Sequence, residues 1–171
     1  MTSGYQDQAI GGEGYGPCGA IVLVMGRNWS AAQRAAVREI LAQHGGHGGG
    51  LNSVAYLFHP VGLLRYPSSA RLAERALAAG AESVQVLAHG ETEVATDPAD
   101  WESVREALAT SGHLPRSASI TWRTAQPVRL EPQAMHRVQA LLDALRALEG
   151  VEAVYTNAEP AVPAGSPGTA A

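Results

Sequence analysis

The sequence contains no lysine. All 12 cationic side chains are arginines, 16 side chains are acidic, and the formal net charge is −4. The arginines are scattered along the chain without a cluster of basic neighbours. Non-specific binding of nucleic acid rests mainly on neutralising phosphates with a basic face. This composition therefore argues against strong, stand-alone nucleic-acid binding.

Cysteine and long apolar runs are also scarce. The one cysteine, Cys18, excludes an internal disulfide framework and suits a reducing cytoplasm. The longest uninterrupted apolar run, residues 20–25, is far too short to span a membrane. The polar, glycine-rich start shows no secretion signal. We therefore expect a cytoplasmic globular protein.

The first and last parts of the chain predict two strand–helix–strand segments. Residues 20–25 read as a buried strand, and residues 31–43 as a helix that begins with a Ser30/Gln33 capping box. A glycine-rich loop ends this helix, and alternating apolar residues at 53–58 predict the next strand. The second segment is a strand at 127–130, a helix from Pro132 to Gly150 and a strand at 151–157.

Residues 62–123 predict a complete β-α-β-β-α-β unit. Its strands lie at 62–67, 83–88, 91–96 and 117–123, and its helices begin after Ser68 or Ser69 and at Asp97-Pro98. The predicted class is α+β, with two ferredoxin-like domains, the second inserted into the hairpin between the two halves of the first. The predicted bounds are 13–60 plus 125–157 for the first domain, 61–124 for the insert, 1–12 for a flexible lead-in and 158–171 for a disordered tail.

The glycine-rich segment Gln43–His59 raises two chemical hypotheses. His44, His47 and His59 could indicate a metal, but structural zinc sites use four ligands, commonly with paired cysteines. The glycines could cradle a phosphate, but phosphate loops run from a strand into a helix amino terminus, and here the glycines follow a helix. We expect no metal and no cofactor. A flexible connection or a partner contact fits better, with His44, His47 and Asn52 as candidate contact residues.

Residues 24–34 have the strand–turn–helix polarity that suits an anion. Arg27 and Arg34 could bracket an anion at the helix start, with Asn28 in the turn. This spacing resembles the phosphate loop of acylphosphatases, small enzymes that also have a ferredoxin-like fold. Here Trp29-Ser30-Ala31 replaces that family's glutamine-glycine-valine centre, and no asparagine is evident to position a water. We expect no catalytic residues.

Several strings in a single register resemble the YebC/PmpR family. They are residues 13–19 (EGYGPCG), 44–46 (HGG), 53–58 (SVAYLF), 76–82 (ALAAGAE) and 154–157 (VYTN). The resemblance runs from about Asp7 to Asn157. It implies two α/β domains, one inserted in the other, and a cytoplasmic regulator of gene expression. Such proteins are described as DNA-binding transcriptional regulators, and relatives include a mitochondrial translational activator.

The sequence also departs from that family. Members start with a lysine-rich helical domain that this sequence does not contain, and they have a glycine where Cys18 stands. Their turn after the first strand is richer in asparagine and arginine than residues 27–32 are here. We expect a shortened paralogue, or a gene whose true start lies upstream.

Three functions remain open at this point. The first is a non-enzymatic regulator of transcription or translation whose partner is DNA, RNA or the ribosome. The second is a protein-interaction or small-ligand-binding module that has lost nucleic-acid binding. The third and most remote is an acylphosphatase-like hydrolase.

Overall fold

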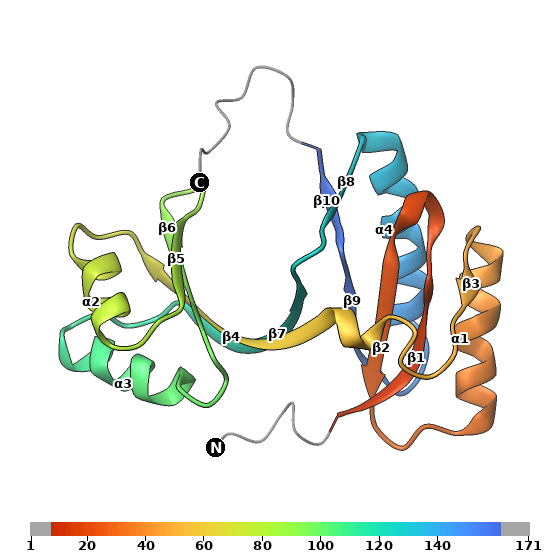
Figure 1. The fold of residues 1–171 in the computed structure, drawn as a ribbon, viewed down its shortest axis with the longest axis horizontal. Coiled ribbons are helices and arrows are strands. Elements are labelled where there is room, and N and C mark those ends of the chain that lie inside the picture. Colours follow the sequence, from red (N-terminus) through yellow and green to blue (C-terminus); the bar gives the residue numbers. More distant parts are fainter. Residues whose placement is uncertain (1–7, 162–171) are drawn as a thin grey trace. The chain divides into compact units, whose positions relative to one another are not determined.

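The computed structural model describes residues 8–161, which divide into two compact units (Figure 1). Unit 1 contains the described residues up to Phe58 and from Thr124 onward, and unit 2 contains His59–Arg123. Each unit combines a four-stranded sheet with two helices. The predicted α+β class is therefore confirmed.

The sheet of unit 1 has the strand order β3-β1-β2-β9. Its strands are β1 (Ala9–Tyr15), β2 (Ile21–Gly26), β3 (His47–Gly48) and β9 (Val151–Thr156). β1 is antiparallel to both β2 and β3, and β2 is antiparallel to β9. A separate parallel pair joins β8 (Val128–Leu130) to β10 (Ala158–Pro160).

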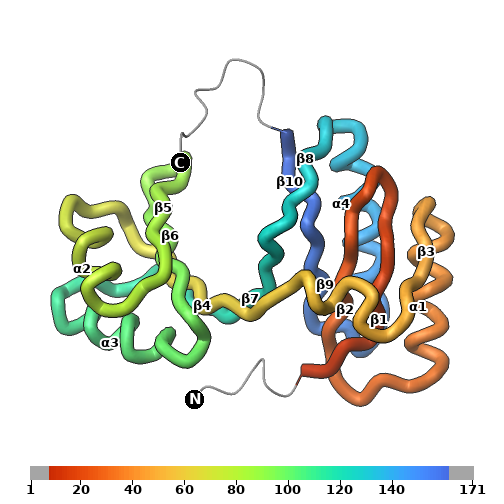
Figure 2. The backbone as a smooth tube through the Cα atoms, viewed as in Figure 1, coloured from red at the N-terminus to blue at the C-terminus, as the bar shows by residue number. Residues whose placement is uncertain are grey.

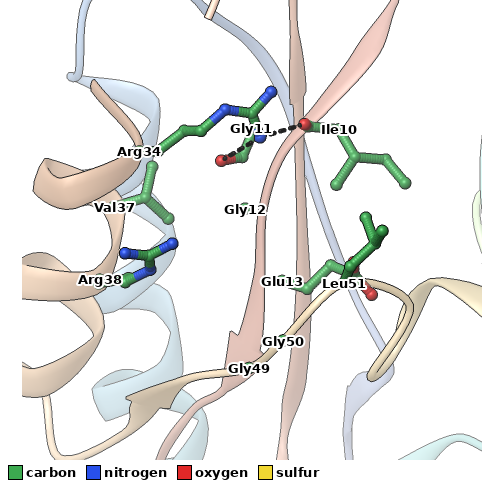
Figure 3. Close-up of a pocket in the computed structure, with 10 residues that line it drawn as sticks. All are labelled: Ile10, Gly11, Gly12, Glu13, Arg34, Val37, Arg38, Gly49, Gly50 and Leu51. Carbon is green, nitrogen blue, oxygen red and sulfur yellow. Dashed lines mark hydrogen bonds between the residues drawn. The ribbon is translucent and has the colours of Figure 1, made fainter. Parts of the chain in front are cut away.

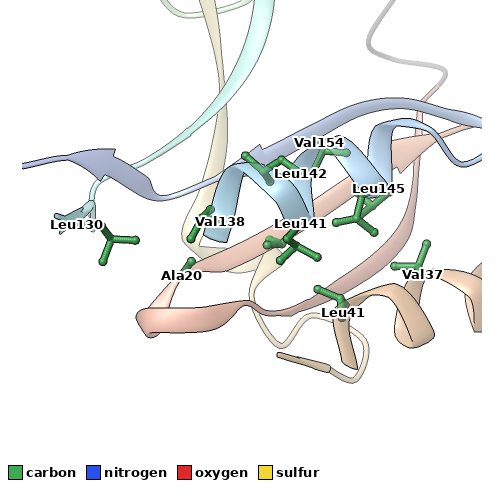
Figure 4. Close-up of a cluster of buried hydrophobic side chains, with 11 residues drawn as sticks. Ala20, Val37, Leu41, Leu130, Val138, Leu141, Leu142, Leu145 and Val154 are labelled. Atoms are coloured by element: carbon green, nitrogen blue, oxygen red, sulfur yellow. The ribbon is translucent and has the colours of Figure 1, made fainter. Parts of the chain in front are cut away.

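Helices α1 (Ala31–Gln43) and α4 (Pro132–Arg146) share one apolar core with this sheet. α1 begins at the predicted capping box. The backbone N–H of Gln33 donates to Ser30 Oγ (3.1 Å), and the backbone N–H of Ser30 donates to Gln33 Oε1 (2.9 Å). Figure 4 shows side chains of both helices gathered near Val154 of β9, and residues of β2 belong to the same cluster. The largest fully buried members are Val22, Val24, Val37, Leu41, Leu141 and Leu145.

Unit 2 can be followed in Figure 2 as the part of the chain that runs from yellow through green to teal. Its elements are β4 (Phe58–Pro67), α2 (Leu72–Ala78), β5 (Ser83–Val86), β6 (Glu91–Thr96), α3 (Trp101–Thr110) and β7 (Ser117–Thr124). The strand order is β5-β6-β4-β7. One core joins the sheet to both helices through Leu64, Tyr66, Leu72, Ala76, Val94, Val104 and Leu108. No helix among the described residues is long and apolar enough to cross a membrane.

The predicted strand at residues 53–58 is wrong. Ala55–Leu57 form a 3-10 helix, and the strand starts only at Phe58, as the first residue of β4. The backbone N–H groups of Val54 and Ala55 donate to the carboxylate of Glu13 instead of to a neighbouring strand. Unit 1 therefore does not follow the predicted β-α-β-β-α-β order, and its sheet contains the β1–β2 hairpin instead.

Two segments expected to be disordered are ordered in part. Residues 9–12 belong to β1. Pairing with β2 provides hydrogen-bond partners for backbone groups of this segment, and this orders a sequence that is rich in glycine. Ala158–Pro160 form β10, paired with β8. The rest of the predicted lead-in and tail, residues 1–7 and 162–171, lies outside the described residues.

The starts of two helices in unit 2 also differ from the prediction. Neither Ser68 nor Ser69 caps α2 with its side chain, and Ser68 Oγ lies 2.8 Å from Thr92 Oγ1 instead. α3 begins at Trp101, because Asp97 Oδ1 accepts from the backbone N–H of Ala99 in a local turn before the helix.

Close contacts explain most of the glycines after α1. Among the glycines at 45, 46, 48, 49 and 50, only Gly45 has a positive φ, of 82°. A Cβ atom at Gly46 would lie 1.9 Å from the carbonyl oxygen of Tyr15, and one at Gly48 would lie 2.8 Å from Arg38 Cγ. The loop is therefore packed tightly against β1 and α1.

This packing predicts opposite outcomes for two glycines of the same loop. Gly46→Ala places a methyl group against backbone and is expected to lower the free energy of unfolding by about 1–3 kcal/mol. Gly50→Ala meets nothing within 4 Å and has no positive φ, so it is expected to be neutral or to stabilise by up to about 1 kcal/mol. Urea unfolding of both variants measures the difference, and equal effects would contradict the tight packing.

Candidate functional site

The buried side chain of Glu13 joins β1 to the loop that follows β3. It is only 6% exposed. Its carboxylate accepts hydrogen bonds from the backbone N–H groups of Asn52 (2.7 Å), Val54 (3.0 Å) and Ala55 (2.7 Å). Its backbone carbonyl accepts another from the N–H of Gly49 (2.8 Å). A buried carboxylate is costly without such donors, so Glu13 and the loop hold each other in place.

β1 presents glycine to one side and Glu13 to the other. A Cβ at Gly12 would lie 2.5 Å from Val37 Cγ1, and one at Gly14 would lie 2.6 Å from Leu41 Cδ1. Both glycines therefore face α1 and let it approach the strand. Because successive residues of a strand point to opposite faces, the side chain between them points away from the helix. Glu13 thus binds the loop on the face opposite α1.

A pocket of about 150 Å³ lies between α1 and the outer edge of β1 (Figure 3). β3 pairs only with Gly14 and Tyr15, so residues 10–13 of that edge have no strand partner among the described residues. Figure 3 shows Arg34, Val37 and Arg38 reaching from α1 towards this edge. The pocket is lined by Ile10, Gly11, Gly12, Glu13, Arg34, Val37, Arg38, Gly49, Gly50 and Leu51.

The predicted anion-binding residues lie in different surroundings. Arg27 Nε is 3.2 Å from a carboxylate oxygen of Glu152, on β9. Asn28 has a left-handed φ of 55° in the turn before α1. Arg34 Nη1 donates to the carbonyl of Ile10 (2.9 Å), at the pocket. Arg27 and Arg34 thus have separate partners, and the anion-binding role of these three residues stays a prediction.

The predicted partner-contact residues all have defined positions. The ring of His47 stacks on that of Tyr15, with centroids 4.8 Å apart, where β3 pairs with β1. His44 is the C-cap of α1, and Asn52 has a left-handed φ of 60° while its N–H binds Glu13. Their contact role stays a prediction. Within residues 8–161, no three His, Cys, Asp or Glu side chains are grouped so that they could hold a metal ion.

Two residues of this region were not singled out from the sequence as site residues. Glu13 is acidic within a glycine-rich run. The three backbone N–H groups that donate to its side chain lie 39 to 42 residues further along the chain. The sequence signal at Glu13 is its place in the string EGYGPCG, which resembles the family. Arg38 stands four residues after Arg34, and that spacing places both on one helix face. The spacing was the available signal.

Replacing the Glu13 carboxylate tests its structural role. Glu13→Gln keeps the size of the side chain but sets an amide N–H₂ among three N–H donors. We expect a loss of about 2–3 kcal/mol in the free energy of unfolding. The matched control is Glu39→Gln. Glu39 is an exposed residue of α1 whose carboxylate accepts a hydrogen bond from the Gln43 side chain, and we expect a change within about 0.5 kcal/mol. Urea denaturation measures both, and equal effects would refute the role of Glu13.

Comparison with known proteins places this architecture in a family. The family model described as the TACO1/YebC second and third domain matches residues 8–158. The crystal structure of a conserved hypothetical protein, Aq1575 from Aquifex aeolicus, is similar with a TM-score of 0.77 and 30% identity. The match covers 96% of this chain and 70% of the Aq1575 chain.

Two relatives carry the name probable transcriptional regulatory protein. NE0210 of Nitrosomonas europaea is 41% identical over 151 residues, which cover 85% of this chain and 62% of the relative. A protein of Acidovorax sp. strain JS42 is 38% identical over 151 residues, which cover 86% of this chain and 63% of the relative. The chain thus spans less than two thirds of the length of these relatives. It belongs to the TACO1/YebC family and corresponds to that family's second and third domains.

Proposed function

We propose that the chain is a non-enzymatic regulator of gene expression that acts in the cytoplasm on DNA, RNA or the ribosome. The observation that carries this proposal is the family match over residues 8–158. The names of the relatives support a role in transcription. Because the chain spans only part of those relatives, their whole activity is carried over here as a proposal.

The arrangement of charge limits how such a protein binds nucleic acid. Half of the 12 arginines lie within ion-pair distance of a carboxylate: Arg27, Arg65, Arg105, Arg116, Arg123 and Arg146. Because the net charge is −4, the long-range electrostatic field of the protein does not attract phosphates. Binding therefore depends on a few arginines in defined geometry, and we expect modest affinity with a strong dependence on salt.

We also infer that unit 2 is a ferredoxin-like domain inserted into unit 1. Its β-α-β-β-α-β element order supports this assignment. So does the division of unit 1 into two sequence segments that flank unit 2. An inserted domain of this kind has its own hydrophobic core and offers a second surface for the same partner.

Salt-dependent binding tests the proposed function. Fluorescence anisotropy with labelled DNA and RNA, and co-sedimentation with ribosomes, are measured over a salt series. We expect binding at low salt to one of these partners, with log K falling linearly against log[salt]. Arg34→Ala is expected to reduce the slope by about 1, since one phosphate contact is lost.

Arg146→Ala is the matched control, because Arg146 Nη1 lies 3.5 Å from Asp143 Oδ1 and is already paired. It should leave the slope unchanged. Absence of binding to DNA, RNA and ribosomes at low salt would contradict the proposal. Co-purification of a stoichiometric protein partner under those conditions would favour a protein-interaction module instead.

A further inference from the structure

Arg38 lines the pocket from α1, and its side chain is exposed. Its aliphatic stem packs against Gly48, where an added Cβ would lie 2.8 Å from Arg38 Cγ. Its guanidinium forms no hydrogen bond or ion pair with any residue that the structure describes. The stem thus lies against Gly48, while the charged head remains available in the pocket beside β1.

Arg34 stands next to Arg38 and is held in place. Its Nη1 donates to the carbonyl oxygens of Ile10 (2.9 Å) and Gly11 (3.5 Å), as the dashed lines in Figure 3 show. These bonds aim the guanidinium along the edge of β1 and leave Nε and Nη2 as free donors within the described residues. Two like charges four residues apart on one helix repel each other, and an anion between them removes that cost.

Among the described residues, the acidic side chain that lines the pocket is that of Glu13, and it is turned away from this pair. Glu13 directs its carboxylate to the backbone N–H groups of Asn52, Val54 and Ala55, on the face of β1 opposite α1. Those three donors already satisfy it. The pocket therefore presents two guanidiniums against one compensated carboxylate, which is a local reversal of the overall negative charge.

We propose that this pocket binds a phosphate group, with Arg34 and Arg38 as its donors. The guanidinium fork matches the tetrahedral oxygens of phosphate and forms short, charge-assisted hydrogen bonds with them. A volume of about 150 Å³ accommodates one such group. The buried Val37 and the exposed Leu51 add apolar surface to the lining.

The phosphate can belong to a free small molecule or to the backbone of a nucleic acid. The chemistry of recognition is the same in both cases. Only the nucleic-acid source rests on the proposed function. The experiment therefore measures the two sources separately.

The test is a titration of the purified full chain with inorganic phosphate at constant ionic strength, followed by ¹H–¹⁵N NMR shifts and by thermal stability. We expect saturable shifts at β1 and α1 and a rise in Tm. Arg38→Gln should weaken phosphate binding at least about tenfold, since it removes a charge-assisted donor. Arg38→Lys should restore binding only in part, because the charge returns without the fork.

The matched control is Arg71→Gln. Arg71 is an exposed arginine before α2 whose side chain also has no partner among residues 8–161, and it lies outside the pocket. It should leave phosphate binding unchanged. No saturable phosphate effect on the wild-type chain, or an equal loss in Arg71→Gln, would overturn the proposal. Arg38→Gln itself removes no hydrogen bond of the fold, so loss of folding does not confuse the result.

A second titration with a single-stranded oligonucleotide separates the two sources. Loss of both phosphate and oligonucleotide binding in Arg38→Gln supports the pocket as a backbone-phosphate site. Loss of phosphate binding alone supports a free phosphate-bearing ligand. If the wild-type chain binds phosphate through Arg38 but binds no nucleic acid or ribosome, the pocket stands and the proposed function fails.

Discussion

The hydrogen bonding of one buried carboxylate organises unit 1. The side chain of Glu13 accepts hydrogen bonds from three backbone N–H groups, and its backbone carbonyl accepts a fourth. All four donors lie in one loop. Removing a charged acceptor from water is tolerable only with such donors. The loop in turn can adopt its path, with Asn52 at a left-handed φ of 60°, because Glu13 fixes it from the strand. The pocket between α1 and β1 is bounded by the same strand and the same loop.

Elements whose signals are local could be predicted from the sequence. α1 starts at the capping box and ends where Gly45 takes a positive φ, as its sequence indicates. α4 starts at Pro132, and its periodic apolar residues form the core of unit 1. The hairpin between β5 and β6 turns at Gly90, with a φ of 76°. In each case the residues that decide the structure are neighbours in the sequence.

Elements that depend on distant contacts could not be predicted. Alternating apolar residues at 53–58 favour a strand, but the Glu13 carboxylate captures the N–H groups of Val54 and Ala55 some 40 residues away. β1 contains too many glycines to indicate a strand, yet Gly12 and Gly14 are required by the approach of α1. Cys18 has a φ of 61°, a conformation that favours glycine, so the glycine expected there from the family resemblance has a geometric reason.

The exclusive use of arginine fits a protein that recognises anions locally rather than through its overall field. Carboxylates already pair with half of the arginines, and Glu93 alone, 5% exposed, holds both Arg65 and Arg123. The paired side chains contribute little free positive charge. Arg34 and Arg38 differ: Arg34 donates to a carbonyl, Arg38 lies against a glycine, and neither pairs with a carboxylate among the described residues. Neither contact neutralises the guanidinium. A chain with a net charge of −4 can therefore still offer a defined anion site, provided that the strand edge and the glycine loop position the guanidiniums of Arg34 and Arg38 together.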